Sequence, residues 1–213
     1  MGVGEIPLEG AGAATGTRTP DLVLVDLCRK GDPQAFARLV ALHEGMVFNL
    51  AARLLGESEE ARDVAQNVFL HVYRKLGQFQ GRSALRTWIY RITVNQCHNR
   101  RRWWKSRKRE KEEPLDELST GPHAARLADQ RPRSSPFKET RRRERARRVQ
   151  AALLELSFEH RTVLVLREIE GLSCDAIAET LGVAVGTVKS RLSRAREALR
   201  RQLADWIGED GVE

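Results

Sequence analysis

The sequence predicts an all-α protein made of two small helical domains joined by a charged, flexible linker. Apolar residues recur at spacings of three and four along two stretches of the chain, as one buried face of an α-helix requires. No run alternates apolar and polar residues as a half-buried strand does, and no Asn-Gly hairpin signal is present. A segment of charged residues and prolines separates the two stretches. A length of 213 residues is enough for two such domains.

The first helical domain is expected to span residues 21–102, after a flexible leader of residues 1–20 that is rich in glycine and alanine. We expect Ser58 to cap the second helix, because its hydroxyl can accept a hydrogen bond from a free helical amide. The first apolar face consists of Leu39, Leu42, Met46 and Leu50, and that of the second helix of Val64, Val68 and Val72. A third helix is expected from Ala84 to Arg102.

Residues 103–140 interrupt the helical pattern. They contain a basic run from Lys105 to Lys111, an acidic cluster from Glu112 to Glu117, and four prolines. Few apolar side chains remain there to form a core. This composition predicts a charged, flexible linker.

The second helical domain is expected to span residues 141–207, followed by a tail of residues 208–213. Its first helix is marked by Val149 to Leu156, and its second by Val163, Leu166 and Ile169. Gly171 ends this second helix. Ser173 is expected to cap a short helix, and Gly182 to form a tight turn before a long basic helix. A short helix, a glycine turn and a longer basic helix make a helix-turn-helix.

In the long helix, Val188, Leu192 and Leu199 are expected to face the core, which leaves a polar and basic face open. Such side chains donate to guanine edges and to phosphates. Arg194 lies about 140° around the helix from Lys189, so we expect Arg194 to enter a DNA groove and Lys189 to contact the backbone. A basic surface helix in an ordinary bundle is the alternative. The candidate DNA-binding residues are Thr187, Lys189, Ser190, Arg191, Ser193, Arg194 and Arg196.

A second candidate site lies in the first domain. Trp88, Arg91, Asn95 and Asn99 share one helical stripe, and a short loop precedes them. Amide side chains can pair with bases and an aromatic ring can stack on them, which suits unpaired or flipped bases. The alternative, favoured by composition alone, is that Trp88 and Tyr90 are core residues. The loop residues are Phe79, Gln80, Gly81, Arg82 and Ser83.

The composition narrows the function classes. The formal net charge of +8 favours a nucleic-acid partner. The three cysteines, Cys28, Cys97 and Cys174, are far apart, which suits a reducing cytosol and leaves no zinc spacing. No nucleophile motif, paired carboxylates or phosphate-binding glycine loop is found, so we expect no cofactor, no metal and no enzyme activity. No targeting signal or membrane span is present, which predicts a cytoplasmic protein.

Three runs together resemble the extracytoplasmic-function (ECF) sigma factors, the smallest members of the sigma-70 family. They are Asp63-Val-Ala-Gln-Asn-Val-Phe69, Thr87-Trp-Ile-Tyr-Arg-Ile-Thr-Val-Asn95 and Val185-Gly-Thr-Val-Lys-Ser-Arg-Leu-Ser-Arg-Ala-Arg196. The chain departs from the family's usual pattern at Asn67, where Glu is common, at Ala184, where Ser or Pro is common, and at Cys174, where an aromatic is usual.

This resemblance implies specific roles. The first domain would be sigma region 2, which docks on the clamp of core RNA polymerase and melts the minus-ten element. The second would be region 4, which reads the minus-thirty-five element and contacts the polymerase flap. An anti-sigma factor would be a further partner, and a stress response a common setting. The implied polymerase-binding residues are Asp63, Gln66, Asn67 and Leu70. The competing interpretation is a stand-alone helix-turn-helix regulator.

Overall fold

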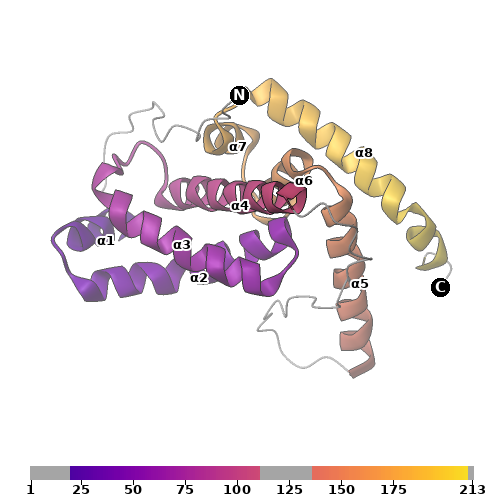
Figure 1. Ribbon diagram of the computed structural model, residues 1–213, viewed down its shortest axis with the longest axis horizontal. Helices are drawn as coiled ribbons and strands as arrows, with labels where there is room; N and C mark the ends of the chain where they lie inside the picture. Colours follow the sequence, from indigo (N-terminus) through magenta and orange to yellow (C-terminus); the bar gives the residue numbers. More distant parts are fainter. Residues whose placement is uncertain (1–19, 111–135, 211–213) are drawn as a thin grey trace.

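Helices form all the regular structure in the described part of the chain. The computed structural model describes residues 20–110 and 136–210 (Figure 1). The expected leader up to residue 19, the central linker at 111–135 and the last three residues lie outside the described residues. The helices are α1 (Pro20–Arg29), α2 (Pro33–Leu55), α3 (Ser58–Lys75), α4 (Leu85–Glu110), α5 (Pro136–Glu155), α6 (Phe158–Leu164), α7 (Cys174–Leu181) and α8 (Val185–Asp210). The predicted all-α class is confirmed.

Two helices extend into the segment predicted to be a linker. α4 continues past Arg102 to Glu110, and α5 begins at Pro136 rather than near residue 141. The residues that extend α4 are mostly Trp, Lys and Arg, and Lys and Arg are good helix formers when no proline interrupts them. Pro136 stands at the first helical position, where its fixed φ and missing N–H cost little. High charge alone was therefore a poor indicator of the helix boundary.

Local capping explains several of the helix ends. Asp32 accepts hydrogen bonds from the amides of Gln34 and Ala35 at 2.8 and 3.3 Å, and the Ser173 hydroxyl accepts one from Ala176 at 3.1 Å. The predicted turn at Gly182 has φ +64° and ends α7. The prediction for Ser58 is wrong: it is the first helical residue, and Glu57 at the cap position makes no side-chain bond. Acidic residues in the first turn of α3 stabilise this helix end instead, because their negative charge interacts favourably with the positive end of the helix dipole.

Two residues predicted to face the core are exposed. Leu42 lies 67% exposed beside the buried stripe of α2, which follows Leu39, His43 and Val47 at spacings of four. Ile169 is 43% exposed because a π-helical turn, Val165–Ile169, follows α6. A π turn inserts an extra residue and rotates the side chains that follow it.

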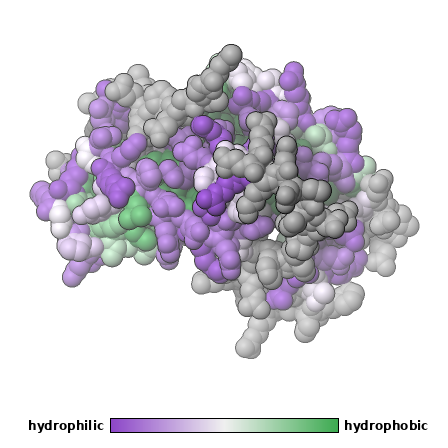
Figure 2. Space-filling model, viewed as in Figure 1, coloured by the Kyte–Doolittle hydropathy of each residue, from purple (hydrophilic) through white to green (hydrophobic). Residues whose placement is uncertain are grey.

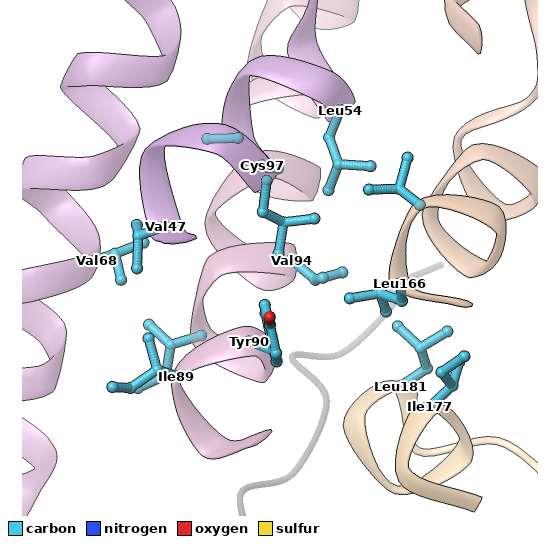
Figure 3. Packing of buried hydrophobic residues seen from close by; sticks show 14 of the residues in the cluster. Val47, Leu54, Val68, Ile89, Tyr90, Val94, Cys97, Leu166, Ile177 and Leu181 are labelled. Carbon is cyan, nitrogen blue, oxygen red and sulfur yellow. The ribbon is translucent and has the colours of Figure 1, made fainter. Parts of the chain in front are cut away.

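The two domains pack against each other and share one hydrophobic core. α4 lies between α2 and α3 on one side and α6 and α7 on the other (Figure 1). Figure 3 shows Val94 and Cys97 of α4 beside Leu54 of α2, with Leu166 and Leu181 of the second domain facing them. The sequence predicted two domains joined by a linker, and it gave no indication of this shared interior.

Arg161 of α6 joins the two domains at this interface. Its Nε donates to the Leu153 carbonyl at 2.8 Å, and its two terminal nitrogens donate to the carbonyls of Leu54, Leu154 and Leu156. These carbonyls lie at the C-terminal ends of α2 and α5 and in the turn that follows α5, and the C-terminal end of a helix carries partial negative charge. Burial lowers the pKa of Arg161 to about 10, so the side chain stays a cation at neutral pH.

Gly56, which ends α2, allows the second domain to approach closely. Its φ is +89°, and a Cβ atom placed there would lie 2.7 Å from Leu154 Cδ1 of α5. Next to it, Gln150 of α5 donates to the carbonyls of Ala52 and Arg53 at 3.3 Å each. A side chain at residue 56 would therefore strain both the backbone and the domain interface.

Gly56→Ala should destabilise the protein more than Gly31→Ala. Gly31 has a similar φ of +82°, but a Cβ atom placed there would meet no other atom within 4 Å, so it is a matched control for backbone strain alone. Each substitution should cost about 1–2 kcal/mol from the left-handed backbone, and Gly56→Ala about 1–3 kcal/mol more from crowding Leu154. Urea denaturation followed by circular dichroism measures both. Equal losses in the free energy of unfolding would show that the Leu154 side chain moves aside without cost.

Candidate nucleic-acid interface

The helix-turn-helix forms as the sequence predicts. The cap at Ser173 and the turn at Gly182 set α7 against the start of α8. Val188, Leu192 and Ala195 of α8 are at most 3% exposed, so this side of the helix is fixed in the core. α8 lies along the outer edge of the molecule, where its opposite side is open (Figure 1).

The open face of α8 carries most of the predicted DNA-binding residues. Lys189, Ser190, Ser193, Arg194 and Arg196 are exposed, while Thr187 and Arg191 are half-buried. The Ser190 hydroxyl donates to the Thr187 carbonyl at 3.0 Å, which orients it along the helix. Arg196 pairs with Glu168 at 2.6 Å, so in this conformation it supports the π turn instead of extending outwards.

The candidate site on α4 is divided between core and surface. Trp88 is buried against Phe79, with ring centroids 5.3 Å apart, so neither ring is presented for stacking on a base in this conformation. The core alternative is what the structure shows for Trp88 and for Tyr90. Asn95 is half-buried and Asn99 is exposed. Sequence spacing placed these residues on one stripe, but Phe79 covers Trp88 and α7 of the second domain covers Arg91.

Arg91 is also buried, and the helix-turn-helix holds it there. Its guanidinium donates to the Glu179 carbonyl of α7 at 2.7 Å and lies 3.8 Å from the Glu179 carboxylate. Burial lowers the pKa of Arg91, and the Glu179 carboxylate opposes this effect. A residue predicted to contact DNA is therefore covered by α7 of the helix-turn-helix.

The loop before α4 is the accessible part of this candidate site. Gln80, Gly81 and Arg82 are exposed, and Ser83 is half-buried. Gly81 has φ +69°, which a side chain would strain. Arg29 of α1 donates to the carbonyls of Leu76 and Phe79 and so fixes the start of the loop. Sequence reasoning missed Arg29, because only the tertiary fold brings it to the loop.

The predicted polymerase-binding residues of α3 lie on one open face. Asp63, Gln66, Asn67 and Leu70 are all exposed, and Phe69 packs partly inward against the core. Tyr73 extends the same face with a 64% exposed side chain and packs edge-on against Phe36 of α2 at 5.1 Å. Its spacing of three from Leu70 could have indicated it. Figure 2 shows exposed apolar side chains among hydrophilic ones over α1, α2 and α3.

Comparisons with known proteins agree with these two modules. The family described as Sigma-70 region 2 matches residues 39–110, and Sigma-70, region 4 matches residues 146–199. The chain is 36% identical to the RNA polymerase sigma-H factor of Pseudomonas aeruginosa, over 91% of this chain and 98% of that protein. It is 35% identical to the ECF RNA polymerase sigma factor SigW of Bacillus subtilis, over 83% and 93% respectively. The chain belongs to the ECF sigma factors of the sigma-70 family.

Solved structures support the same fold for this sigma factor. It resembles CnrH, solved in complex with the cytosolic domain of CnrY, with a TM-score of 0.59 and 26% identity over 86% of this chain and 96% of that one. It also shares the fold of the sigma factor RpoE, solved with the anti-sigma factor NepR from Bartonella quintana, with a TM-score of 0.61, 23% identity, and coverage of 79% of this chain and 96% of that one.

The described part of this sigma factor contains no candidate metal site, no disulfide and no membrane-spanning helix. No group of three or more His, Cys, Asp or Glu that could hold a metal ion occurs among the described residues. Cys28, Cys97 and Cys174 are free thiols. No helix in the described ranges is both long and apolar enough to cross a membrane.

A buried tyrosine connects sigma region 2 to sigma region 4. The Tyr90 hydroxyl donates to the Glu170 carboxylate at 2.6 Å and accepts hydrogen bonds from Arg86 at 2.9 and 2.7 Å. Burial raises the pKa of Tyr90, and the hydrogen bond to Glu170 raises it further. The folded protein therefore retains the Tyr90 proton more tightly than the unfolded chain does.

Tyr90→Phe should make the protein less sensitive to alkaline pH. A raised folded-state pKa gives stability that is complete below the unfolded tyrosine pKa of about 10 and is lost as pH rises above it. The parent should therefore lose stability more steeply than Tyr90→Phe between about pH 9.5 and 11. Tyr73→Phe, on an exposed ring, is the matched control and should keep the parent's slope. Identical slopes for all three proteins in urea denaturation would contradict this role of Tyr90.

Proposed function

We propose that this chain is an alternative sigma factor that binds core RNA polymerase and directs promoter-specific initiation by reading the minus-thirty-five and minus-ten elements and opening the DNA. The observation that carries the proposal is that one chain combines a helix-turn-helix having an open basic face with a region 2 domain having an open α3 face. A stand-alone helix-turn-helix regulator would not need the second of these.

The roles of individual residues follow from exposure and charge. The outward residues of α8, with Ser190 and Arg194 at the centre, are proposed to read the minus-thirty-five element. The loop at 80–83, with Asn95 and Asn99, is proposed to take unpaired bases of the minus-ten element. The exposed residues of α3 are proposed to contact the polymerase clamp. The polymerase performs the chemistry, so we infer that this chain has no catalytic site of its own and acts in the cytoplasm.

Reading both elements together requires the two domains to separate. The elements are named for positions about 25 base pairs apart, which is roughly 85 Å of B-DNA. In this structure the two domains are packed together instead, and Arg91 of α4 donates to the Glu179 carbonyl of α7 at 2.7 Å. We infer that opening also releases Arg91 towards DNA.

An anti-sigma factor is a further proposed partner. CnrH and RpoE, which share this fold, were solved with the cytosolic domain of CnrY and with NepR respectively. A protein that binds both domains in their packed arrangement would keep Arg91 covered by Glu179. It would act by stabilising one of two states of the chain, which requires a difference in affinity between those states.

Run-off transcription with purified core polymerase tests the function directly. The chain added to core polymerase should give a product that starts at one position on its own promoter and is absent without the chain. A stand-alone regulator gives no such product with core polymerase alone. Transcript start-site mapping after overexpression identifies the promoter to use.

The α3 face should govern affinity for core polymerase. Gln66→Ala combined with Leu70→Ala removes two exposed side chains and should weaken core binding at least about tenfold, corresponding to about 1.4 kcal/mol. Gln202→Ala, an exposed glutamine of α8, is the control and should bind like the parent. Fluorescence titration of labelled protein with core polymerase measures this. Parent-like affinity of the folded double variant would place the clamp contact elsewhere.

On α8, Arg194→Ala should change which minus-thirty-five sequence is preferred, while Lys189→Ala should lower affinity for all sequences about equally. Loss of a bidentate base contact costs roughly 1–3 kcal/mol at one position, whereas loss of a phosphate contact reduces the salt dependence by about one contact. Binding of both variants, as holoenzyme, to a library of minus-thirty-five sequences at two salt concentrations separates the cases. An unchanged sequence preference for Arg194→Ala would refute this orientation of α8.

A further inference from the structure

Helix α1 packs against the start of the loop at 80–83, which is proposed to take unpaired bases. The helix precedes residues 39–110, which match sigma-70 region 2, and it carries none of the residues proposed to contact DNA or polymerase. It packs against the 3₁₀ turn Leu76–Gln78 that leads into the loop. The contacting residues are 47 and 50 positions apart in the chain, so only the tertiary fold brings them together.

Arg29, the last residue of α1, bridges two main-chain carbonyls in front of this loop. Its Nε donates to the Leu76 carbonyl at 3.2 Å, and one terminal nitrogen donates to the Phe79 carbonyl. The Leu76 carbonyl also accepts a hydrogen bond from the Phe79 amide at 3.2 Å. Carbonyls at the end of a helical segment lack partners within it, and a planar guanidinium that donates to two of them restricts their relative orientation.

Asp26 restricts the orientation of the Arg29 guanidinium. The second terminal nitrogen of Arg29 lies 3.4 Å from Asp26 Oδ1, one helical turn earlier in α1. The two side chains are 36% and 40% exposed, so this ion pair contributes little to stability by itself. With one terminal nitrogen directed at Asp26, the other terminal nitrogen and Nε face the two carbonyls.

Two more contacts restrict the backbone of the loop. The buried Phe79 ring packs on Trp88 with ring centroids 5.3 Å apart. Gly81 has φ +69°, and a Cβ atom placed there would lie 3.3 Å from Leu22 Cδ2 of α1. The main chain is therefore restricted at residues 79 and 81, while the side chains on either side of Gly81 remain exposed.

A loop that is ordered before its ligand arrives favours capture of an unpaired base. Removing a base from the duplex costs the free energy of unstacking it, and ordering the loop at the same time adds a cost in conformational entropy. Restraints that already hold the loop in the binding conformation reduce this second cost. Loss of Arg29 would remove the restraint on the main chain at residues 76 and 79.

We propose that Arg29 is a positioning residue for promoter opening, which holds the main chain at Leu76 and Phe79 so that the loop at 80–83 captures one unpaired base of the minus-ten element. This inference rests on the proposed function, because its ligand is the opened promoter strand. Arg29 acts through the loop and does not contact DNA. Binding to core polymerase and to the minus-thirty-five element should therefore not depend on it.

The first test measures binding of holoenzyme to single-stranded minus-ten oligonucleotides, intact or with one abasic position. A scan with the parent identifies the position at which removal of the base weakens binding most. Arg29→Gln should bind the intact oligonucleotide about 3–10-fold more weakly than the parent does, because the loop must then be ordered on binding. Both proteins should bind the oligonucleotide that lacks this base equally well.

The rate of promoter opening gives a second measurement. On a duplex promoter, Arg29→Gln holoenzyme should form the closed complex with the affinity of the parent. It should then open the DNA about 3–10-fold more slowly, because capture of the unpaired base is weakened. Permanganate reactivity of unpaired thymines over time measures the opening rate.

Two variants separate the geometry of Arg29 from its charge. Lys30→Gln removes the neighbouring exposed cation and should bind both oligonucleotides like the parent. Arg29→Lys keeps the charge but lacks the planar fork that donates to two carbonyls, so it should bind the intact oligonucleotide at least about threefold more weakly than the parent. Urea denaturation establishes that each variant is folded.

Three results would overturn the proposal. Equal weakening of Arg29→Gln on the intact and abasic oligonucleotides would mean that Arg29 does not act through capture of the base. Parent-like binding and opening by Arg29→Gln would mean that the loop does not need it. Parent-like binding by Arg29→Lys would mean that charge, and not the bridge between two carbonyls, is what matters.

These outcomes also separate this inference from the proposed function. If the parent holoenzyme prefers the minus-ten strand to a scrambled one and Arg29→Gln behaves like the parent, only the role of Arg29 is refuted. If the parent holoenzyme shows no such preference, the proposed function is refuted and the role of Arg29 with it.

Discussion

The packing of this molecule depends on the Arg161 guanidinium, which is buried among main-chain carbonyls from both domains. The carbonyls of Leu153, Leu154 and Leu156 belong to the end of α5 and the turn after it, whereas the carbonyl of Leu54 belongs to α2. Free carbonyls at the ends of helices need donors when they are buried. One side chain satisfies such carbonyls from two helices, so the end of α2 and the end of α5 are fixed relative to each other.

Several features of the interface follow from that constraint. Where the ends of α2 and α5 meet, Gly56 has the left-handed φ of +89° that favours glycine, and Leu154 occupies the space where a side chain would lie. The same packing brings α7 against α4. There Glu179 covers Arg91, and the Glu170 carboxylate accepts a hydrogen bond from the Tyr90 hydroxyl. Residues proposed to act on DNA therefore stabilise the packed state, and binding of the promoter must compete with those contacts. Because the two domains share one core, their separation is a cooperative event instead of a local one.

The surfaces that remain open have distinct chemical characters. α3 presents polar and apolar side chains, including Leu70 and Tyr73, which suits a protein partner. The outer face of α8 is basic and rich in hydroxyls, and the end of α4 combines cations with indoles. Each of these surfaces lies away from the domain interface. A single conformation can therefore present its surface for polymerase while part of its surface for DNA stays covered.

The sequence alone determined the helices and the family, because helical periodicity, caps such as Ser173 and turns such as Gly182 are local properties. Spacing within one helix also identified the open face of α8, and the family resemblance indicated the exposed residues of α3. The tertiary structure decided which residues of the α4 stripe are accessible. Trp88, Arg91 and Asn99 share a side by spacing, but α7 covers Arg91 and Phe79 packs on Trp88. Burial by a distant segment leaves no local pattern, so periodicity could not separate the covered half of α4 from its exposed end at Trp103 and Arg107.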